Sequence, residues 1–105
     1  MIARVWHGVV PEDKSEEYLD YVNMTGVPGL SSTPGNLGVM VFRRVEQGRV
    51  HFVLTSFWQS YEAISAFAGP DVGLARYYPE DEEYLIELES NVTHYEVVVG
   101  QEILE

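Results

Sequence analysis

The sequence contains no cysteine and only six basic residues, and each scarcity excludes a class of protein. Without cysteine the chain has no disulfide framework, no thiolate metal site and no cysteine nucleophile. The 6 basic residues stand against 17 acidic residues, which gives a formal net charge of −11. This charge repels phosphate backbones and anionic membrane surfaces. We therefore expect no nucleic-acid partner and no membrane partner.

Long apolar runs are also scarce. Runs such as VVVG at 97–100 are far shorter than the roughly 20 residues that a membrane-spanning helix needs. Nothing at the N-terminus resembles the apolar core of a secretory signal, so we expect a cytoplasmic protein. Apolar residues nevertheless make up 46% of the 105 residues, which is enough for one hydrophobic core. We predict a single domain over residues 1–105.

The first half of the chain reads as a strand, a helix and a hairpin. β-Branched and aromatic residues predict a strand over residues 2–10, before Pro11. Proline followed by acidic residues is typical of a helix start, and the apolar spacing after it predicts a helix that ends near residues 26–28. Glycine and proline predict a connecting loop with one short turn at most over residues 26–36. Two strand-like runs separated by EQG predict a β-hairpin over residues 36–58.

The second half reads as helical segments followed by a strand. Ser60 is a good N-cap, and the apolar spacing that follows it predicts a second helix that ends at Gly69. A further helical turn is expected over residues 71–78, and another helical segment over residues 80–88. β-Branched residues return over residues 92–99 and predict a fourth strand.

The order β-α-β-β-α-β predicts an α+β, ferredoxin-like fold, in which an antiparallel sheet carries both helices on one face. Neither face of the first strand is cleanly polar, because its side chains alternate between the two faces. One side takes Ala3, Val5, His7 and Val9, and the other takes Ile2, Arg4, Trp6 and Gly8. An uncovered apolar sheet face predicts a homodimer. The segment 101–105 could extend toward the partner.

Two segments, TPGNLGVMVFRR at 33–44 and VHFVLTSFWQSYEAISAF at 50–67, resemble the antibiotic biosynthesis monooxygenase family of dimeric α+β barrels. The likeness is sharpest at Trp58, which ends the third strand before a short polar turn and a helix that contains Glu62 and Ala63. This resemblance implies a dimeric α+β barrel. Such barrels include cofactor-free quinone-forming monooxygenases, haem-degrading monooxygenases, small isomerases and proteins without a known reaction.

The resemblance also implies a pocket inside each protomer, between the sheet and the helices. The strand-end tryptophan of the family lines that pocket, which implies that Trp58 stacks on a planar substrate. The alternative for Trp58 is a core aromatic at a strand end. Haem-degrading relatives supply an axial histidine from the second helical region, where this chain has Tyr77 or a neighbour. They also use an asparagine on the first strand, where this chain has Trp6 and His7. The resemblance therefore implies a reaction without haem or any other cofactor.

Arg76 is followed directly by Tyr77 and Tyr78 in the predicted helical turn. An inward guanidinium could hold an anionic enolate, phenolate or carboxylate, and a tyrosine hydroxyl could donate a directing hydrogen bond. Consecutive helical residues point about 100° apart, so at most two of the three can share one target. The alternative is a surface ion pair between Arg76 and Glu80 or Asp81, which would contribute little.

The three histidines, His7, His51 and His94, lie in predicted strands without the spacing of a zinc site, so we predict no metal. Adjacent strands could still bring two of them together. His7 is the candidate base, because an ordinary pKa of about 6.5 suits deprotonation of a phenol or enol. Its alternative is a hydrogen-bonded packing residue. Asn36 is a candidate substrate contact or a turn residue, and the acidic run at 80–83 is interpreted as a solvated helix start.

The resemblance, taken with these candidate residues, implies a cofactor-independent monooxygenase that acts on a planar aromatic or enolic small molecule. His7 would remove a proton, Trp58 would pack against the ring, and Arg76 would stabilise the developing negative charge. The further substrate contacts predicted are Trp6, Tyr77, Tyr78 and Asn36. Two alternatives remain: a non-catalytic dimeric barrel that binds a small ligand, and a haem-binding or haem-degrading monooxygenase.

Overall fold

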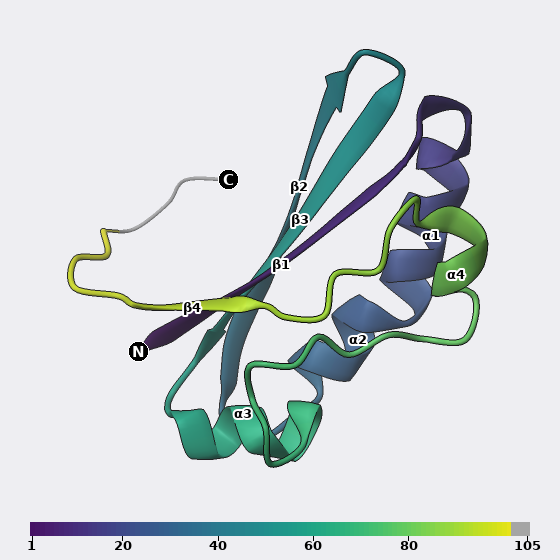
Figure 1. The fold of residues 1–105 in the computed structure, drawn as a ribbon. Helices are drawn as coiled ribbons and strands as arrows, with labels where there is room; N and C mark the ends of the chain where they lie inside the picture. Colours follow the sequence, from purple (N-terminus) through teal and green to yellow (C-terminus); the bar gives the residue numbers. More distant parts are fainter. Residues whose placement is uncertain (102–105) are drawn as a thin grey trace.

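The computed structural model describes residues 1–101. Its four strands form one antiparallel sheet in the order β2-β3-β1-β4, as Figure 1 shows. The strands are β1 (Ile2–Pro11), β2 (Asn36–Glu46), β3 (Arg49–Trp58) and β4 (Thr93–Glu96). This order confirms the predicted ferredoxin-like α+β fold.

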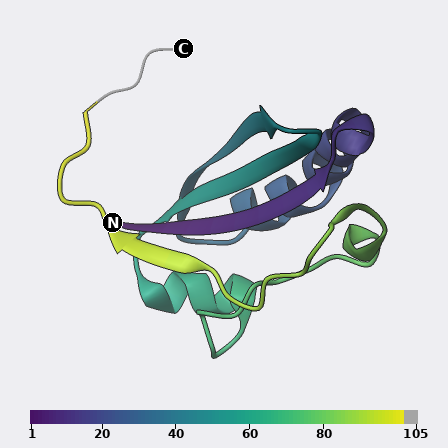
Figure 2. The ribbon, with the colours of Figure 1, turned by 45° about the horizontal axis from the view of Figure 1, so that its top comes forward.

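The helices are grouped on one side of the sheet, and the other broad face carries no helix from the described part of the chain (Figures 1 and 2). They are the 3-10 helix η1 (Glu12–Lys14) and the α-helices α1 (Ser15–Met24), α2 (Gly26–Ser31), α3 (Tyr61–Ala68) and α4 (Asp81–Tyr84). Within residues 1–101, none of these helices is long and apolar enough to cross a membrane.

The register between β1 and β3 decides which side chains meet the helices. Pairs such as Gly8 with Phe52 and Val10 with Val50 face the helices, because side chains alternate along each strand. The buried positions of β3 therefore recur at every second residue and are Val50, Phe52, Leu54, Ser56 and Trp58. They pack against side chains of α1, α2 and α3, which include Tyr18, Leu30 and Ile64, to form the core.

The turn between β2 and β3 consists of Gln47 and Gly48, whose φ angles are 50° and 79°. Two successive positive φ angles are typical of a type I′ turn, whose twist matches that of the strands it joins. Glycine adopts this conformation without a steric penalty. The hairpin predicted from EQG is confirmed.

The loop predicted for residues 26–36 is only partly correct, because it contains α2. Pro28 is tolerated there since it lies in the first helical turn, where a backbone N–H has no acceptor within the helix. Leu30 is buried, and Val27 packs against the core. Tertiary burial thus stabilises a helix that its glycine and proline content alone disfavours.

The helical turn predicted for residues 71–78 is absent from the structure. Leu74 instead forms an isolated antiparallel bridge with Asn91, and the Ala75 N–H donates to the Ser90 carbonyl at 2.9 Å. Pairing with a distant segment therefore satisfies backbone groups that a helix would otherwise satisfy. The helix expected over 80–88 is limited to α4, and the strand expected over 92–99 is limited to β4. The predicted extension at 101–105 lies, apart from Gln101, outside the described residues.

Removing the N-cap of α3 should destabilise the fold. The Ser60 hydroxyl oxygen accepts a hydrogen bond from the Ala63 N–H at 3.1 Å. We expect Ser60→Ala to lower the free energy of unfolding in urea by about 1 kcal/mol. Ser65→Ala is the control, because the Ser65 hydroxyl only donates back to the Glu62 carbonyl in the same helix. Equal losses in the two variants would contradict a capping role for Ser60.

Candidate functional site

A cavity of about 40 Å³ lies between the helix-facing side of the sheet and the helical layer. Its aromatic lining residues are Trp6, Tyr18, Phe67 and Tyr78, its other polar and charged ones are Arg4, Thr25, Ser56, Arg76 and Asp81, and Val22, Gly26, Leu30 and Leu54 complete it. A water molecule needs roughly 10–15 Å³ of such space, and a cavity that holds benzene needs about 150 Å³. The cavity therefore admits a small polar group, and a ring can enter only when side chains at its rim move.

Trp6 forms one wall of the cavity because Gly8 leaves room for its ring. A Cβ atom at position 8 would meet both the Trp6 ring and the Leu85 side chain. The Trp6 ring also packs edge-on against Tyr77, with ring centroids 6.2 Å apart. The placement of Trp6 at the cavity thus depends on glycine two residues later on the same face of β1.

Arg4 is the most unusual residue of the site, because it is only 3% exposed and still charged. Its Nη2 donates to the Leu74 carbonyl at 2.9 Å, but its Nη1 is buried without a hydrogen-bond partner among residues 1–101. Burial lowers the pKa of Arg4 to about 10, so the guanidinium remains protonated at neutral pH.

Arg76 and Tyr78 face the same cavity, whereas Tyr77 does not. The Arg76 Nη1 donates to the Phe67 carbonyl at 3.0 Å, and its guanidinium lies over the rings of Phe67 and Tyr78. The Tyr78 hydroxyl is buried without a partner among the described residues. The Tyr77 hydroxyl instead donates to the Glu89 carbonyl at 2.5 Å. Arg76 and Tyr78 are two residues apart and both point toward the cavity. This alternation is that of an extended chain and not that of a helix.

Among residues 1–101, Asp81 is the only carboxylate that lines the cavity, and it is 5% exposed. It accepts hydrogen bonds from the Tyr18 hydroxyl at 2.9 Å and from the Tyr78 N–H at 2.6 Å. Burial raises the pKa of Asp81, although these two hydrogen bonds act in the opposite direction. Burial and the neighbouring Asp81 carboxylate also raise the pKa of Tyr18, which keeps its phenol protonated. The interpretation of residues 80–83 as solvated is therefore wrong for Asp81.

Trp58 and Asn36 do not line the cavity. Trp58 is fully buried behind its wall, donates from Nε1 to the Ser56 hydroxyl oxygen at 2.8 Å, and packs near Phe67. Trp58 therefore supports two lining residues instead of stacking on a bound ring. Asn36 begins β2, and its backbone N–H donates to the Thr33 carbonyl, which is the turn role considered as the alternative.

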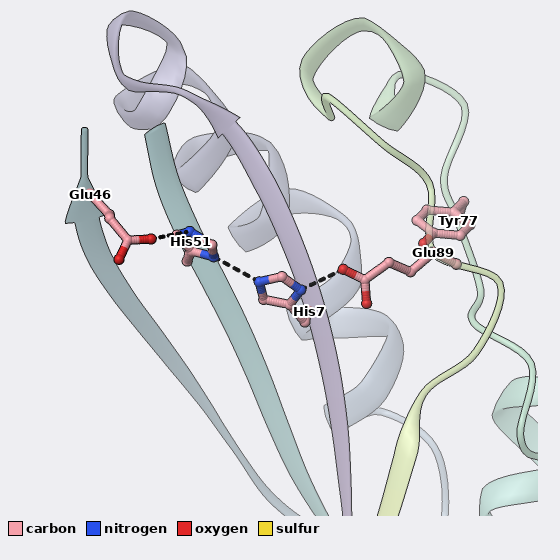
Figure 3. A network of polar contacts seen from close by, with 5 residues as sticks. All are labelled: His7, Glu46, His51, Tyr77 and Glu89. Atoms are coloured by element: carbon pink, nitrogen blue, oxygen red, sulfur yellow. Dashed lines mark hydrogen bonds and ion pairs between the residues drawn. The ribbon is translucent and has the colours of Figure 1, made fainter. Parts of the chain in front are cut away.

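His7 lies on the opposite face of the sheet from the cavity, because its side chain alternates with those of its neighbours Trp6 and Gly8. There its Nε2 lies 2.9 Å from the His51 Nδ1, and its Nδ1 lies 2.5 Å from a Glu89 carboxylate oxygen. The His51 Nε2 in turn lies 3.3 Å from Glu46 (Figure 3). Within a single chain the structure therefore does not bring His7 together with Arg76 at the cavity, and the role predicted for His7 as a base stays untested.

The contacts in Figure 3 run without a break from Glu46 through His51 and His7 to Glu89. This network ties β1, β2 and β3 to the segment before β4 on the outer face of the sheet.

Sequence reasoning missed Arg4, Ser56 and Asp81. The alternation on the first strand already places Arg4 on the same side as Trp6. Ser56 likewise lies between buried Leu54 and Trp58 in the alternating pattern of β3. The available signal for Arg4 and Ser56 was thus a polar residue at a strand position whose side chain faces the core. No comparable signal marks Asp81, since its burial depends on Tyr18 from a distant helix.

Removing the hydroxyl of Tyr18 should destabilise the protein, because the buried Asp81 carboxylate would lose one of its two hydrogen bonds. We expect Tyr18→Phe to lower the free energy of unfolding by about 1–3 kcal/mol in urea denaturation. Tyr61→Phe is the matched control, since Tyr61 is exposed on α3. A Tyr18 variant as stable as the Tyr61 variant would show that this hydrogen bond contributes nothing.

Solved structures with the same fold cover nearly the whole chain. A candidate antibiotic biosynthesis monooxygenase from Bacillus cereus is 17% identical, with a TM-score of 0.66 and 97% coverage of both chains. The heme-degrader MhuD from Mycobacterium tuberculosis, solved with two hemes in its active site, is 23% identical, with a TM-score of 0.63 and coverage of 97% of this chain and 100% of that one. At such identities the likeness shows the fold alone. Curated protein sequences give no match.

The cavity offers no histidine to a haem iron, because none of the three histidines lines it. Its lining contains one phenol without a partner, that of Tyr78, which packs against Gly29. Among residues 1–101, no group of three or more histidine, aspartate or glutamate side chains is arranged to hold a metal ion.

The sequence profile of the antibiotic biosynthesis monooxygenases matches residues 1–71. That match runs from β1 through α3 and includes the β2–β3 hairpin, Trp58 and the Ser60 cap. It stops before the segment that carries Arg76, Tyr78 and Asp81. With two thirds of its length matched, the chain belongs to the antibiotic biosynthesis monooxygenase family.

Proposed function

We propose that the protein is a cofactor-independent monooxygenase that oxidises a planar aromatic or enolic small molecule. Family membership supports a monooxygenase-type function and leaves the substrate open. The observation that carries the proposal is the cavity itself, which combines aromatic walls with buried hydrogen-bond donors that have no partner among residues 1–101. Such donors stabilise negative charge strongly when water is excluded.

In this proposal the aromatic walls hold the substrate ring, and the charged groups hold its oxygen atom. Trp6 and Phe67 offer flat apolar surfaces to a planar molecule. Arg76 donates to a phenolate or enolate oxygen. It is exposed and lines the cavity, so the ring enters where this side chain moves outward.

Asp81 takes the role of base in place of His7, because it is the only carboxylate of the cavity within the part of the chain that the structure describes. It removes a proton from the activated carbon of the substrate, and burial increases its basicity by raising its pKa. The carbanion then forms a C–O bond with O2 and takes up a proton to give a hydroperoxide. Loss of water leaves a carbonyl group, so one oxygen atom enters the product and the other enters water.

The reaction can be tested with an anthrone, whose activated CH2 group lies between two aryl rings. We expect one O2 to be consumed for each anthraquinone formed, with one 18O atom from 18O2 in the product, as measured with an oxygen electrode and mass spectrometry. Tight anthrone binding without O2 uptake would contradict the enzyme and support a non-catalytic ligand-binding barrel.

The role of Asp81 generates a separate prediction. The rate should fall as the pH is lowered through the raised pKa of Asp81, because the protonated carboxyl cannot accept a proton. Asp81→Asn should lower kcat by about 100-fold and abolish this acidic limb of the pH profile. Asp20→Asn, an exposed change of the same charge on α1, is the control. An unaltered acidic limb in Asp81→Asn would exclude Asp81 as the base.

We also propose that the outer face of the sheet forms a homodimer interface, since exposed apolar side chains lie on it. Phe42 is 50% exposed and Tyr95 is 58% exposed, and their register partners, Val53 and Ala3, lie on the same face. Burial of such a face in a two-fold dimer would remove it from water.

A charge on this face should therefore separate the subunits. We expect Phe42→Glu to convert the dimer into a monomer in sedimentation-velocity measurements, because it would bury an unpaired carboxylate. Met24→Glu is the matched control, since Met24 is 76% exposed on α1. A wild-type protein that is monomeric at high concentration would overturn the dimer.

A further inference from the structure

We propose that Arg4 is a ligand-binding residue, and that it binds a carboxylate group carried by the molecule that occupies the cavity. This inference rests on the proposed function only in placing that molecule in the cavity. It goes further by defining the ligand as an aromatic acid rather than a neutral ring. Four observations support it: the burial of Arg4, its free nitrogen, the charge balance of the cavity and the size of the cavity.

The first two observations concern Arg4 alone. Its side chain is 97% buried, and a buried charge is normally paired with an opposite charge. None of the ion pairs formed by residues 1–101 involves Arg4. One of its two terminal nitrogens is bonded to the Leu74 carbonyl, and the other has no partner in that part of the chain. The Arg4 Nη1 atom is therefore free to bind an anionic group that residues 1–101 do not supply.

The third observation is the charge of the cavity compared with that of the whole protein. The chain carries a formal net charge of −11 and has only six basic residues. Two of these, Arg4 and Arg76, line the cavity, and neither forms an ion pair within residues 1–101. Both guanidiniums lie within 6 Å of the Phe67 ring, at 5.6 and 4.7 Å. Asp81 alone contributes an opposite charge, and it already accepts from Tyr18 and Tyr78.

The fourth observation is the match between cavity and ligand. About 40 Å³ suits a group of a few atoms, such as a carboxylate, rather than a whole ring. Arg4 is buried, whereas Arg76 is exposed, so a carboxylate would lie at the inner end while the ring would lie toward the rim. The Tyr78 hydroxyl, also without a partner among the described residues, supplies a second donor to the same anion.

The competing explanation is that Arg4 is purely structural. Its hydrogen bond to the Leu74 carbonyl and its position near the Phe67 ring would then serve to hold the segment before α4. This explanation accounts for Nη2 but leaves Nη1 unsatisfied. It also predicts no preference for an anionic ligand over a neutral one of the same shape, and that difference can be measured.

The test uses benzoate and benzamide, which have nearly the same shape and differ in charge. We expect the full-length protein to bind benzoate about tenfold more tightly than benzamide in NMR titrations, because a hydrogen-bonded ion pair out of water is stronger than a neutral contact. The two tryptophans report the location of binding. The indole N–H signal of Trp6, which lines the cavity, should shift, whereas that of Trp58, bonded to Ser56, should shift little.

Arg4→Gln should lower the affinity for benzoate about tenfold and leave that for benzamide unchanged. Arg49→Gln, the same loss of charge at an exposed position of β3, is the control and should change neither. If Arg4→Gln does not fold, Tyr78→Phe replaces it. This variant should weaken the binding of benzoate and leave that of benzamide unchanged. Equal affinities for the two compounds, no benzoate binding in the titration, or an unchanged benzoate affinity in the folded variant would overturn the proposal.

This result is independent of turnover. A protein that prefers benzoate through Arg4, and that binds an anthrone without consuming O2, would contradict the proposed monooxygenase reaction and support the carboxylate site. A protein that oxidises the anthrone but binds benzoate and benzamide equally would support the proposed reaction and contradict the carboxylate site.

Discussion

The antiparallel register of β1 against β3 is the constraint on which the rest of the molecule depends. It pairs Arg4 with Ser56 and Trp6 with Leu54 on the helix-facing side, and His7 with Val53 on the outer side. Since the side-chain period of a strand is two, a slip of one residue would exchange these two sets. The same register thus creates both a cavity with unpaired donors and, on the other face, the histidine chain between Glu46 and Glu89.

The cavity carries features that reduce the stability of the isolated chain. Arg4 is charged and buried without an opposing carboxylate, and the Tyr78 hydroxyl has no partner within residues 1–101. A protein selected only for stability would replace such groups by apolar side chains of similar volume. Locally unfavourable groups that cluster around one space are typical of sites that bind a ligand, because the ligand supplies the missing interactions.

The comparison between expected and observed elements separates local from long-range effects. The β2–β3 turn and α3 were predictable, because their signals lie within a few residues: a glycine with positive φ at position 48 and a serine cap at position 60. α2 and the segment 71–78 were not predictable. Burial of Leu30 stabilises a helix against its glycines, and pairing of Leu74 with Asn91 replaces a helix with extended chain.

For the candidate site, the sequence by itself determined the fold class, the shortage of basic residues and the presence of Arg76 and Tyr78 near an acidic run. It also contained the alternation that puts Arg4 beside Trp6, since that depends only on strand periodicity. Only the tertiary structure decided that Trp58 lies behind the cavity, that Asp81 is buried by Tyr18, and that His7 faces away from both. Those outcomes depend on contacts between residues far apart in the chain, and such contacts leave no pattern in the local sequence.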